Sequence, residues 1–295
     1  MIVVAGASGD LGGRIVQELY ALDAPVIALA RPGTSAASLH DKGFVVRECD
    51  FSNVDSIARA LSGAQCVVSA LSGLDPVIVG AQGRLLDAAV QAGAARFIPS
   101  DFAIDFRRVP PKSNRNLALR RMFLEKAQSA PIRLTSILNG AFMDMLTGTI
   151  PIIQHRIKRV LYWGSADQPM DFTTIADTAR YTARAAIDPE APRWLKIAGA
   201  QVSARDIAAA VSRVRGSTYR VLPAGTLGSL GLIIQIARRI APGGPDDLYP
   251  AWQGMQYMRN LFAGEGAFEP PLDNDRYRDM TWTSLDEVLR AARAA

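Results

Sequence analysis

Cysteine and histidine are scarce in this sequence, with two of each among 295 residues. Cys49 and Cys66 form no C-x-x-C pair, and no histidine lies near them at metal-ligand spacing. We therefore expect two reduced thiols, as in a cytosolic protein, with no disulfide and no metal site. His40 and His155 lie far apart in the sequence, which argues against a histidine-based metal centre and against a Ser-His-Asp triad.

Long hydrophobic runs are also missing. The best candidate, Leu227–Ile236, is far shorter than the roughly 18 residues of a membrane span, and Arg238 and Arg239 follow it. The chain opens on the strand-like run Met1–Gly6 with no basic segment, so we expect no secretory signal. These absences predict a cytoplasmic protein that has no contact with a membrane.

Positive charge predominates, but it is not concentrated in any one segment. The formal net charge is +5, and lysine occurs only at positions 42, 112, 126, 158 and 196. This balance favours anionic ligands in general. Nucleic-acid binding is not expected, because it needs a concentrated basic patch.

The first half of the chain alternates between short apolar runs and longer amphipathic stretches. The apolar runs, rich in valine and isoleucine, are Ile2–Ala5, Pro25–Ala30, Phe44–Arg47, Cys66–Ala70, Arg96–Pro99 and Arg133–Leu138. The amphipathic stretches are Leu11–Leu22, Ser35–Lys42, Val54–Leu61, Val77–Ala92 and Leu117–Gln128. Runs without polar alternation are typical of strands buried on both faces. The pattern predicts βαβ units, and therefore an α/β fold with a parallel sheet flanked by helices.

After about residue 150 this rhythm breaks. We expect strands at Arg159–Tyr162, Leu195–Ala198 and Tyr219–Leu222, helices at Thr174–Ala186, Ser203–Val214, Thr226–Ile240 and Asp246–Ala263, a surface loop at Gly264–Asp279 and a terminal helix. Ser203 is the expected N-cap of its helix. The prediction is a nucleotide-binding domain over 1–150, with 171–188 packing back onto it, and a smaller mixed α/β substrate lobe over 151–295.

A glycine-rich loop joins the first predicted strand to the first helix. It consists of Gly6, Ala7, Ser8, Gly9, Asp10, Leu11 and Gly12. In such loops the first glycine permits a tight turn, the second lets the backbone approach a pyrophosphate, and the third allows close helix packing. The helix N-terminus then offers free N–H groups to the phosphates. Its place at the start of a βα alternation predicts a dinucleotide site.

The end of the second predicted strand distinguishes between the two nicotinamide dinucleotides. An acidic residue there binds the ribose hydroxyls of NAD, whereas an arginine suits the 2′-phosphate of NADP. Here Arg31 ends the strand, Thr34 and Ser35 offer hydroxyl groups close by, and no acidic residue lies between Asp23 and Asp41. The sequence therefore favours NADP(H) over NAD(H).

Further cofactor contacts are expected where the other strands end, because ligands bind at the carboxyl edge of such sheets. The candidates are Asp50 and Phe51 after the third strand, Leu71 and Ser72 after the fourth, Pro99 after the fifth, and Asn139, Gly140 and Phe142 after the sixth. The run from Phe142 to Ile153 is apolar enough to line a substrate cleft, but methionines and aromatic residues at such spacing more often belong to plain core.

Four segments together resemble the NmrA-like and isoflavone-reductase-like branch of the atypical short-chain dehydrogenases. They are Gly6–Gly12, Arg31-Pro32, Arg96–Phe102 and Ile137–Phe142. The run Arg-Phe-Ile-Pro-Ser-Asp-Phe is similar to the FxPSEFG segment of that family, with Asp101 in place of Glu and Ala103 in place of Gly. The resemblance implies a Rossmann-type fold, NADP(H) and a small, often aromatic, substrate.

The expected active-site position departs from the family pattern. Reductases of this family carry a lysine on the helix after that segment, and an ungapped count places Arg120 there. Arginine keeps its proton, so it can stabilise negative charge on a substrate oxygen but cannot act as a base. Lys112, eight residues earlier, is the alternative amine, and Ser100 is a third candidate to meet the substrate.

Two functions remain open at this point. One is an NADPH-dependent reductase of a small aromatic, quinone or carbonyl substrate, in which the cofactor carries the chemistry. The other is a non-catalytic NmrA-like redox sensor that binds NADP(H) and reports to a protein partner, as the missing lysine would suggest. Sugar epimerase or dehydratase chemistry is disfavoured, because no tyrosine has a lysine four residues later.

Overall fold

The computed structural model describes residues 1–148 and 150–294, and the chain divides into two compact units. The first unit comprises Met1–Phe102, Leu119–Leu138 and Ile175–Leu195. The second comprises Ala103–Ala118, Asn139–Thr174 and Lys196–Ala295, and it is comparable in length to the first. Each unit is thus assembled from three separate stretches of chain. The division into domains at residue 150 stays a prediction.

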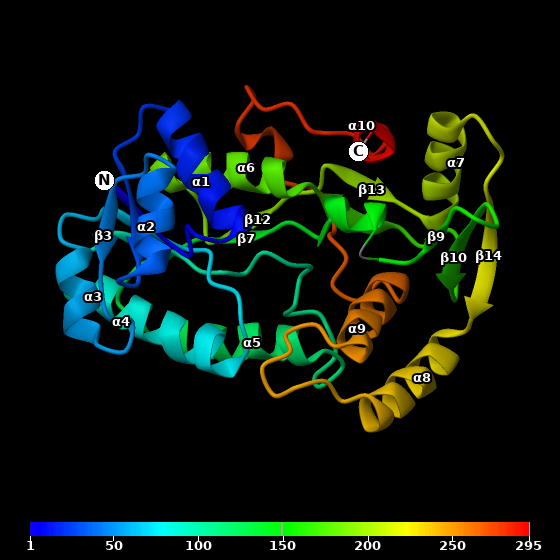
Figure 1. Cartoon of the computed structure of the whole chain (residues 1–295), viewed down its shortest axis with the longest axis horizontal. Helices are drawn as coiled ribbons and strands as arrows, with labels where there is room; N and C mark the ends of the chain where they lie inside the picture. The colour runs from blue at the N-terminus through cyan, green and yellow to red at the C-terminus, as the bar shows by residue number, and fades with distance from the viewer. Residues whose placement is uncertain (149, 295) are drawn as a thin grey trace. The chain divides into compact units, whose positions relative to one another are not determined.

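A six-stranded parallel sheet lies at the centre of the first unit (Figure 1). Its strands follow the order β3-β2-β1-β4-β5-β6. Its strands are β1 (Ile2–Ala5), β2 (Val26–Ala30), β3 (Val46–Glu48), β4 (Cys66–Ser69), β5 (Arg96–Ile98) and β6 (Arg133–Leu134). In the middle of the sheet, Val3 pairs with Ile27 on one side and with Val67 on the other. This arrangement confirms the predicted α/β fold class.

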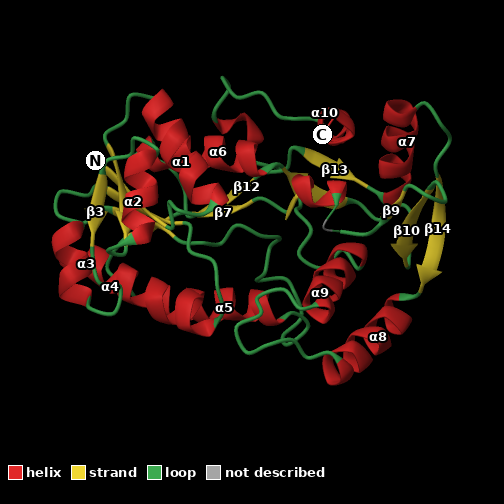
Figure 2. Ribbon diagram, in the orientation of Figure 1, coloured by secondary structure: helices red, strands yellow, loops and turns green. Residues whose placement is uncertain are grey.

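Helices cover both faces of this sheet. They are α1 (Asp10–Ala21), α2 (Thr34–Asp41), α3 (Val54–Ala60), α4 (Gln82–Gln91), α5 (Arg115–Ala127) and α6 (Ile175–Ile187). Helices α1 and α6 pack together on one face, and α3 and α4 pack together on the other (Figure 2). Val3, Val67 and Phe97 are completely buried between these layers. Strands covered on both faces must be apolar throughout, which explains why their sequences do not alternate.

Two elements of the first unit differ from the predictions. The helix expected over Val77–Ala92 begins as a π-helix, η1 (Pro76–Ala81), and becomes α-helical only at Gln82. The strand expected over Arg133–Leu138 is interrupted at Thr135, whose N–H donates to Phe97 in the main sheet, whereas the next N–H donates to Arg193. The chain therefore changes partner, and β7 (Ser136–Leu138) pairs instead with β12 (Trp194–Lys196).

The second unit is a mixed α/β structure with two three-stranded sheets, ordered β14-β10-β9 and β13-β11-β8. The strands are β8 (Ala141–Phe142), β9 (Ile153–Gln154), β10 (Arg159–Trp163), β11 (Met170–Thr173), β13 (Ala200–Val202) and β14 (Arg220–Gly225). The helices are η2 (Met143–Thr147), α7 (Ala204–Arg215), α8 (Leu227–Ile240), α9 (Ala251–Phe262), η3 (Asn274–Arg276) and α10 (Leu285–Ala294). Met143 and Leu146 are buried, in keeping with the core interpretation of that apolar run.

Two helix starts in this unit show how local sequence sets a boundary. Ser203 is confirmed as the N-cap of α7, because its hydroxyl accepts from the Asp206 N–H while its own N–H donates to the Asp206 carboxylate. The predicted start of α9 at Asp246 is wrong. The helix begins at Ala251, directly after Pro250, because proline supplies no N–H and disfavours helical geometry in the residue before it.

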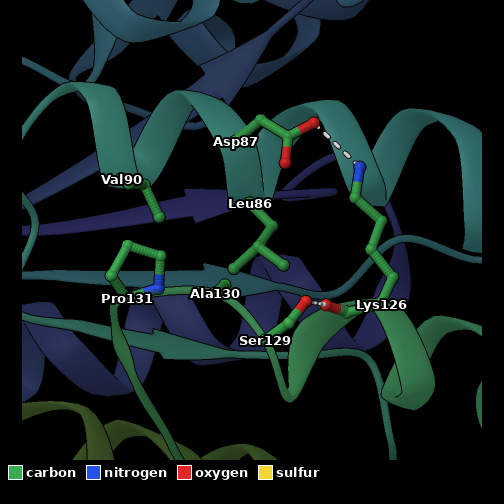
Figure 3. Close-up of a pocket in the computed structure, with 7 residues that line it drawn as sticks. All are labelled: Leu86, Asp87, Val90, Lys126, Ser129, Ala130 and Pro131. Carbon is green, nitrogen blue, oxygen red and sulfur yellow. Dashed lines mark hydrogen bonds and ion pairs between the residues drawn. The ribbon is translucent and has the colours of Figure 1, made fainter.

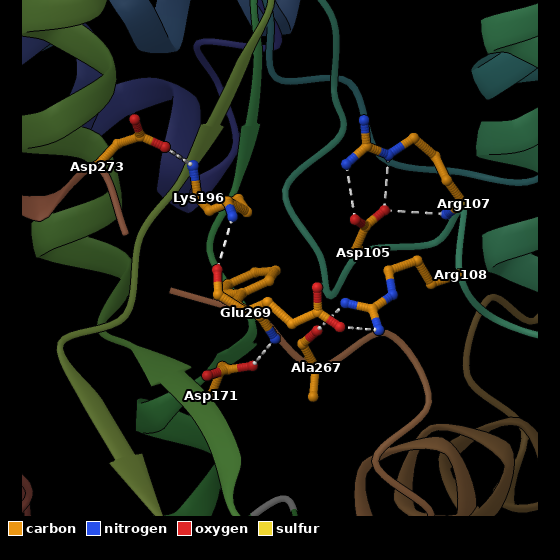
Figure 4. Close-up of polar contacts among 9 residues, drawn as sticks. Asp105, Arg107, Arg108, Asp171, Lys196, Ala267, Glu269 and Asp273 are labelled. Carbon is orange, nitrogen blue, oxygen red and sulfur yellow. Dashed lines mark hydrogen bonds and ion pairs between the residues drawn. The ribbon is translucent and has the colours of Figure 1, made fainter. Parts of the chain in front are cut away.

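The segment 264–279, predicted as a surface loop, is irregular apart from η3 but is tied down by polar contacts (Figure 4). Phe268 is buried, and its N–H donates to the Asp171 carboxylate at 2.8 Å. Arg108 pairs with the Glu269 carboxylate at 2.6 Å. Burial raises the pKa of the Asp171 carboxyl above its usual value. The segment is therefore an anchored part of the second unit.

Both cysteines are free thiols buried in the first unit, and burial raises the pKa of Cys49 to about 12. In the described ranges, no three side chains of the metal-binding types gather where an ion would be held. The described helices include none with the length and apolar character needed to cross a membrane.

Candidate nucleotide site

The order of the strands defines where a ligand belongs in the first unit. From β1 the chain moves outward to β2 and β3, then returns to lay β4, β5 and β6 on the other side of β1. The connections therefore diverge between β1 and β4, and ligands of doubly wound sheets bind at the carboxyl edge beside such a point of divergence. The glycine-rich loop follows β1 at this edge, next to the end of β4.

Two of the three loop glycines are required by the fold itself. Gly6 has φ +85°, and a Cβ there would lie 2.5 Å from the carbonyl oxygen of Ala70. A Cβ on Gly12 would lie 2.2 Å from the carbonyl oxygen of Gly6. Both positions bring backbone against backbone at distances that no side chain allows. These residues therefore hold the turn and the helix in place.

Gly9 differs from the other two, because the fold leaves room for a side chain there. It is exposed with ordinary φ, and the nearest atom to an added Cβ is the Gly6 oxygen at 3.4 Å. It precedes α1 as an N-cap without any side-chain hydrogen bond to the first turn. An open glycine at an uncapped helix start leaves both the space and the N–H donors that a pyrophosphate needs.

Within the same loop, Ala7 is buried, Ser8 is exposed, and Leu11 is half-buried. Asp10, in the first turn of α1, forms an ion pair with Arg14 at 2.6 Å. This pairing offsets the carboxylate that would otherwise repel a phosphate at the helix start.

Arg31 directly follows β2 with its side chain exposed, and no hydrogen bond or ion pair in the described part of the chain involves that side chain. Gly33, at φ +95°, then turns the chain into α2. Ser35 is half-buried at the start of that helix, and the side chain of Thr34 lies outside the described residues. A free guanidinium at this strand end fits a 2′-phosphate, because nothing in the protein has to be displaced to form the contact.

After β3, Asp50 is exposed and accepts hydrogen bonds from the N–H and the hydroxyl of Ser52, at 2.8 and 2.7 Å. These bonds lower the pKa of the Asp50 carboxyl below its usual value. Phe51 is half-buried, and its carbonyl accepts from Arg84 at 2.8 Å. Both residues come after β3, which is the neighbour of β2 in the sheet, so they lie at the predicted carboxyl edge.

The ends of β4 and β5 are joined by a buried hydrogen-bond network that the sequence analysis missed. The Ser100 hydroxyl donates to the Leu71 carbonyl at 2.7 Å, and the Ser100 N–H donates to the side-chain oxygen of Gln82 at 2.9 Å. That oxygen also accepts from the Ser69 hydroxyl at 2.6 Å. The structure thus brings Ser100 against Leu71, while Ser72 is exposed.

A signal for Gln82 was present in the sequence. It lies four residues after Ile78 and three before Leu85, at the spacing of one helix face, and both of these residues are completely buried. A polar side chain on an apolar helix face must find hydrogen-bond partners inside the protein.

Arg120 and Lys112, the two alternative cations, belong to different units. Arg120 is half-buried on α5, within the unit that carries the sheet. Lys112 is exposed in the second unit, in a left-handed conformation with φ +65°. Placing Arg120 with the sheet is consistent with the role inferred from its position, and the roles of both residues stay predictions.

Asn139, Gly140 and Phe142 also belong to the second unit. The N–H groups of Asn139 and Gly140 donate to the Ala103 carbonyl at 3.1 and 3.2 Å. Gly140 has φ +69°, and a Cβ there would lie 2.2 Å from the backbone carbonyl oxygen of Asp171. Packing within this unit therefore accounts for the glycine, and the predicted cofactor contacts of these three residues stay predictions.

A cavity of about 250 Å³ is open on the first unit, away from this edge (Figure 3). It is lined by Leu86, Asp87, Val90, Lys126, Ser129, Ala130 and Pro131. These residues come from the later part of α4, from the end of α5 and from the turn after α5, just before β5 and β6 begin, so the cavity faces the amino edge of the sheet. The Lys126–Asp87 ion pair at 2.8 Å spans it. Ligands of such folds bind at the opposite edge.

The fold and the loop together define a Rossmann-type dinucleotide-binding protein. The model of the NmrA-like family matches residues 1–241, and the chain belongs to that family. Among curated relatives, the isoflavone reductase homolog IRL of Zea mays is 28% identical over 74% of this chain and 75% of its own length. Pinoresinol reductase 1 of Arabidopsis thaliana is 29% identical over 64% of this chain and 65% of its own length.

Solved structures with this fold cover the whole chain. AtPrR2 with NADP+ and (+)pinoresinol superposes with a TM-score of 0.81 at 20% identity, covering 99% of this chain and 98% of the other. The NADPH-dependent quinone oxidoreductase QOR2 of Escherichia coli superposes with a TM-score of 0.74 at 17% identity, with 99% of each chain covered. At these identities the likeness establishes the fold.

Proposed function

We propose that this protein is an NADPH-dependent reductase that acts on a small aromatic or quinone-type substrate. The observation that carries the proposal is the unpaired Arg31 guanidinium at the end of β2, in the same unit as an open Gly9 and an uncapped helix start. These three features fit a dinucleotide with a 2′-phosphate. The family relatives are named for reductases, including isoflavone and pinoresinol reductases, which supports the substrate class.

Each part of the dinucleotide would have its own group of residues. Arg31 would hold the 2′-phosphate, the N–H groups at the start of α1 would hold the pyrophosphate, and Leu71, Ser72 and Pro99 would border the reactive ring. When bound, NADPH supplies the hydride. The role left to the chain is to orient the substrate and to stabilise charge on its oxygen.

Arg120 is the residue proposed to stabilise that charge. Its guanidinium stays protonated, so it would lower the energy of an oxyanion without giving up a proton, and the proton would come from water. Ser100 suits this task less well, because its hydroxyl hydrogen is already donated to the Leu71 carbonyl. Ser100 can therefore offer only lone pairs to a ligand.

The alternative, an NADP(H)-binding sensor without turnover, is favoured by the absence of the family lysine. The enzyme names of the relatives weigh against it. The reductase and the sensor can be distinguished by incubating the purified protein with NADPH and a panel of quinones, aromatic ketones and phenylpropanoid ethers. Loss of nicotinamide absorbance that depends on protein and acceptor supports the reductase. Tight binding of NADPH without consumption by any acceptor would favour the sensor.

A further inference from the structure

Gln82 is a polar side chain with no exposure to solvent, at the junction where the π-helix η1 becomes α4. Its amide oxygen accepts two hydrogen bonds, from the Ser69 hydroxyl at 2.6 Å and from the Ser100 N–H at 2.9 Å. Its amide nitrogen donates to the Ile78 carbonyl at 3.3 Å, inside the π-helix. Single π-helical turns are often found at functional sites.

These bonds connect the ends of two neighbouring strands. Ser69 is the last residue of β4, and it pairs in the sheet with Ala5, directly before the glycine-rich loop. Ser100 follows β5, and its hydroxyl returns to the Leu71 carbonyl at 2.7 Å. Gln82 therefore fixes the separation between the backbone after β4 and the backbone after β5.

The location indicates which half of the dinucleotide depends on this separation. In a doubly wound sheet each set of three strands forms one mononucleotide-binding half. Arg31 directly follows β2, which assigns the phosphorylated adenosine half to β1, β2 and β3. The nicotinamide half then lies over the ends of β4 and β5, where Gln82 holds the backbone.

We infer that Gln82 is a positioning residue for the nicotinamide ring, acting through Ser69 and Ser100; this inference rests on the proposed NADPH-dependent function. The position requires a group that accepts two hydrogen bonds and donates one, and a neutral amide provides both. A charged isostere would keep the acceptors and lose the donor. The effect would fall on the nicotinamide half of the cofactor and leave the adenosine half unchanged.

The variant Gln82→Glu tests this through pH. While the introduced carboxyl is protonated, it reproduces the native pattern, with its carbonyl accepting and its O–H donating to Ile78. Burial raises the pKa of such a carboxyl, so the neutral form persists at low pH and is lost as pH rises through the raised pKa. Once ionised, the introduced carboxylate would repel the Ile78 carbonyl. The side chain would then move and disturb its hydrogen bonds to Ser69 and Ser100.

The measurement is calorimetric binding of NADP+ and of 2′-phospho-ADP-ribose, which lacks nicotinamide, between about pH 5.5 and 8.5, where a buried glutamate is expected to titrate. We expect NADP+ affinity in Gln82→Glu to match that of the unaltered protein at the acid end and to fall about tenfold at the alkaline end, a loss of roughly 1.4 kcal/mol. Affinity for 2′-phospho-ADP-ribose should match the unaltered protein throughout. Since both ligands share the 2′-phosphate, its own titration cancels in the comparison.

The control is Gln17→Glu, on the exposed surface of α1, which adds the same charge and should change neither affinity. If Gln82→Glu unfolds at alkaline pH, Ser69→Ala removes one hydrogen bond of the network at constant charge, and a selective, smaller loss of NADP+ affinity is expected. Equal losses for both ligands, or no pH-dependent loss, would overturn the positioning role while leaving the proposed function standing. Failure of the unaltered protein to bind either ligand would instead overturn the proposed function, and the inference with it.

Discussion

The two halves of the candidate nucleotide site are built in opposite ways. Over β1 and β2 the groups expected to meet the ligand are exposed and not bonded to other side chains of the described residues, as Gly9 and Arg31 show. Over β4 and β5 the polar groups are buried and bonded to one another, as in the network of Ser69, Gln82 and Ser100. The first half presents groups that can bind a charged ligand, whereas the hydrogen bonds of the second half hold the backbone in a fixed geometry.

This difference follows from what each half of a dinucleotide needs. Phosphates carry charge and are held by N–H groups and guanidinium groups, which must be accessible before the ligand arrives. A nicotinamide ring reacts only when it is correctly oriented, and a displacement of about 1 Å can cost on the order of 10²-fold in rate. Substitutions in the first half should therefore weaken binding through the phosphates, whereas substitutions in the second half should act on the nicotinamide ring, in its binding or in its rate of reaction, and spare the adenosine half.

The largest effect is expected at Gly9. In Gly9→Val the added side chain occupies the space where the pyrophosphate must lie, while the protein itself tolerates a Cβ with its nearest neighbour at 3.4 Å. Binding of NADPH and NADH should be lost, with the far-UV circular dichroism and the unfolding temperature preserved. Gly244→Val, at an exposed glycine with open space around it, is the matched control. Normal affinity in Gly9→Val would place the nucleotide elsewhere.

The next largest effect concerns Arg120 and is an effect on rate. Arg120→Ala should lower kcat by about 10²–10³-fold, the range for one lost electrostatic donor, with little change in NADPH affinity. Arg120→Lys should preserve or raise activity, because lysine keeps the positive charge and is the residue of the family pattern. Lys112→Ala should be nearly silent in the same steady-state assay. If Lys112 proves essential and Arg120 dispensable, the ungapped alignment of this helix is wrong.

Arg31→Ala should weaken NADPH binding by about 1.5–3 kcal/mol, the value of a hydrogen bond to a charged group, and should leave NADH binding almost unchanged. The measurement is titration of both cofactors. Arg156→Ala, which removes another exposed arginine, in the second unit, controls for the change in net charge. Equal losses for NADPH and NADH, or a native preference for NADH, would contradict the assignment of Arg31.

Ser100→Ala is expected to have the smallest effect. The hydroxyl is committed to the Leu71 carbonyl, so its removal should cost the protein about 1 kcal/mol of stability, as for an ordinary hydrogen bond. The N–H bond to Gln82 remains, and kcat should fall less than about tenfold, well below the 10²–10⁴ typical of a lost acid or base. Thermal unfolding and steady-state kinetics provide the two readouts. A loss of kcat as large as that of Arg120→Ala would show that Ser100 acts directly on the substrate.

Local sequence was sufficient for the elements that local physics controls. The β1 strand, the turn at Gly6 and helix α1 were predicted within a residue, because apolar runs, glycine and helix periodicity leave few alternatives there. Ser203 was likewise predicted as an N-cap, since its partner Asp206 is only three residues away.

Where a long-range partner decides the structure, the sequence was less informative. The strand expected over Arg133–Leu138 is divided because two different neighbours compete for consecutive N–H groups. The helix expected to begin at Val77 opens as a π-helix and places Gln82 beside residues from two strands. Neither partner lies within the window that a periodicity argument examines.

The sequence by itself thus determined the fold class and the position of the glycine-rich loop, and it predicted the preference for a 2′-phosphate, because each depends on residue types at fixed short spacing. Only the tertiary structure decided that Gly6 and Gly12 serve packing while Gly9 is left open, and that Gln82 joins the ends of β4 and β5. The physical reason is that steric contact and buried hydrogen bonds are properties of neighbours in space. Chain spacing specifies such neighbours only within an element, and the parallel sheet brings together the residues that follow strands far apart in sequence.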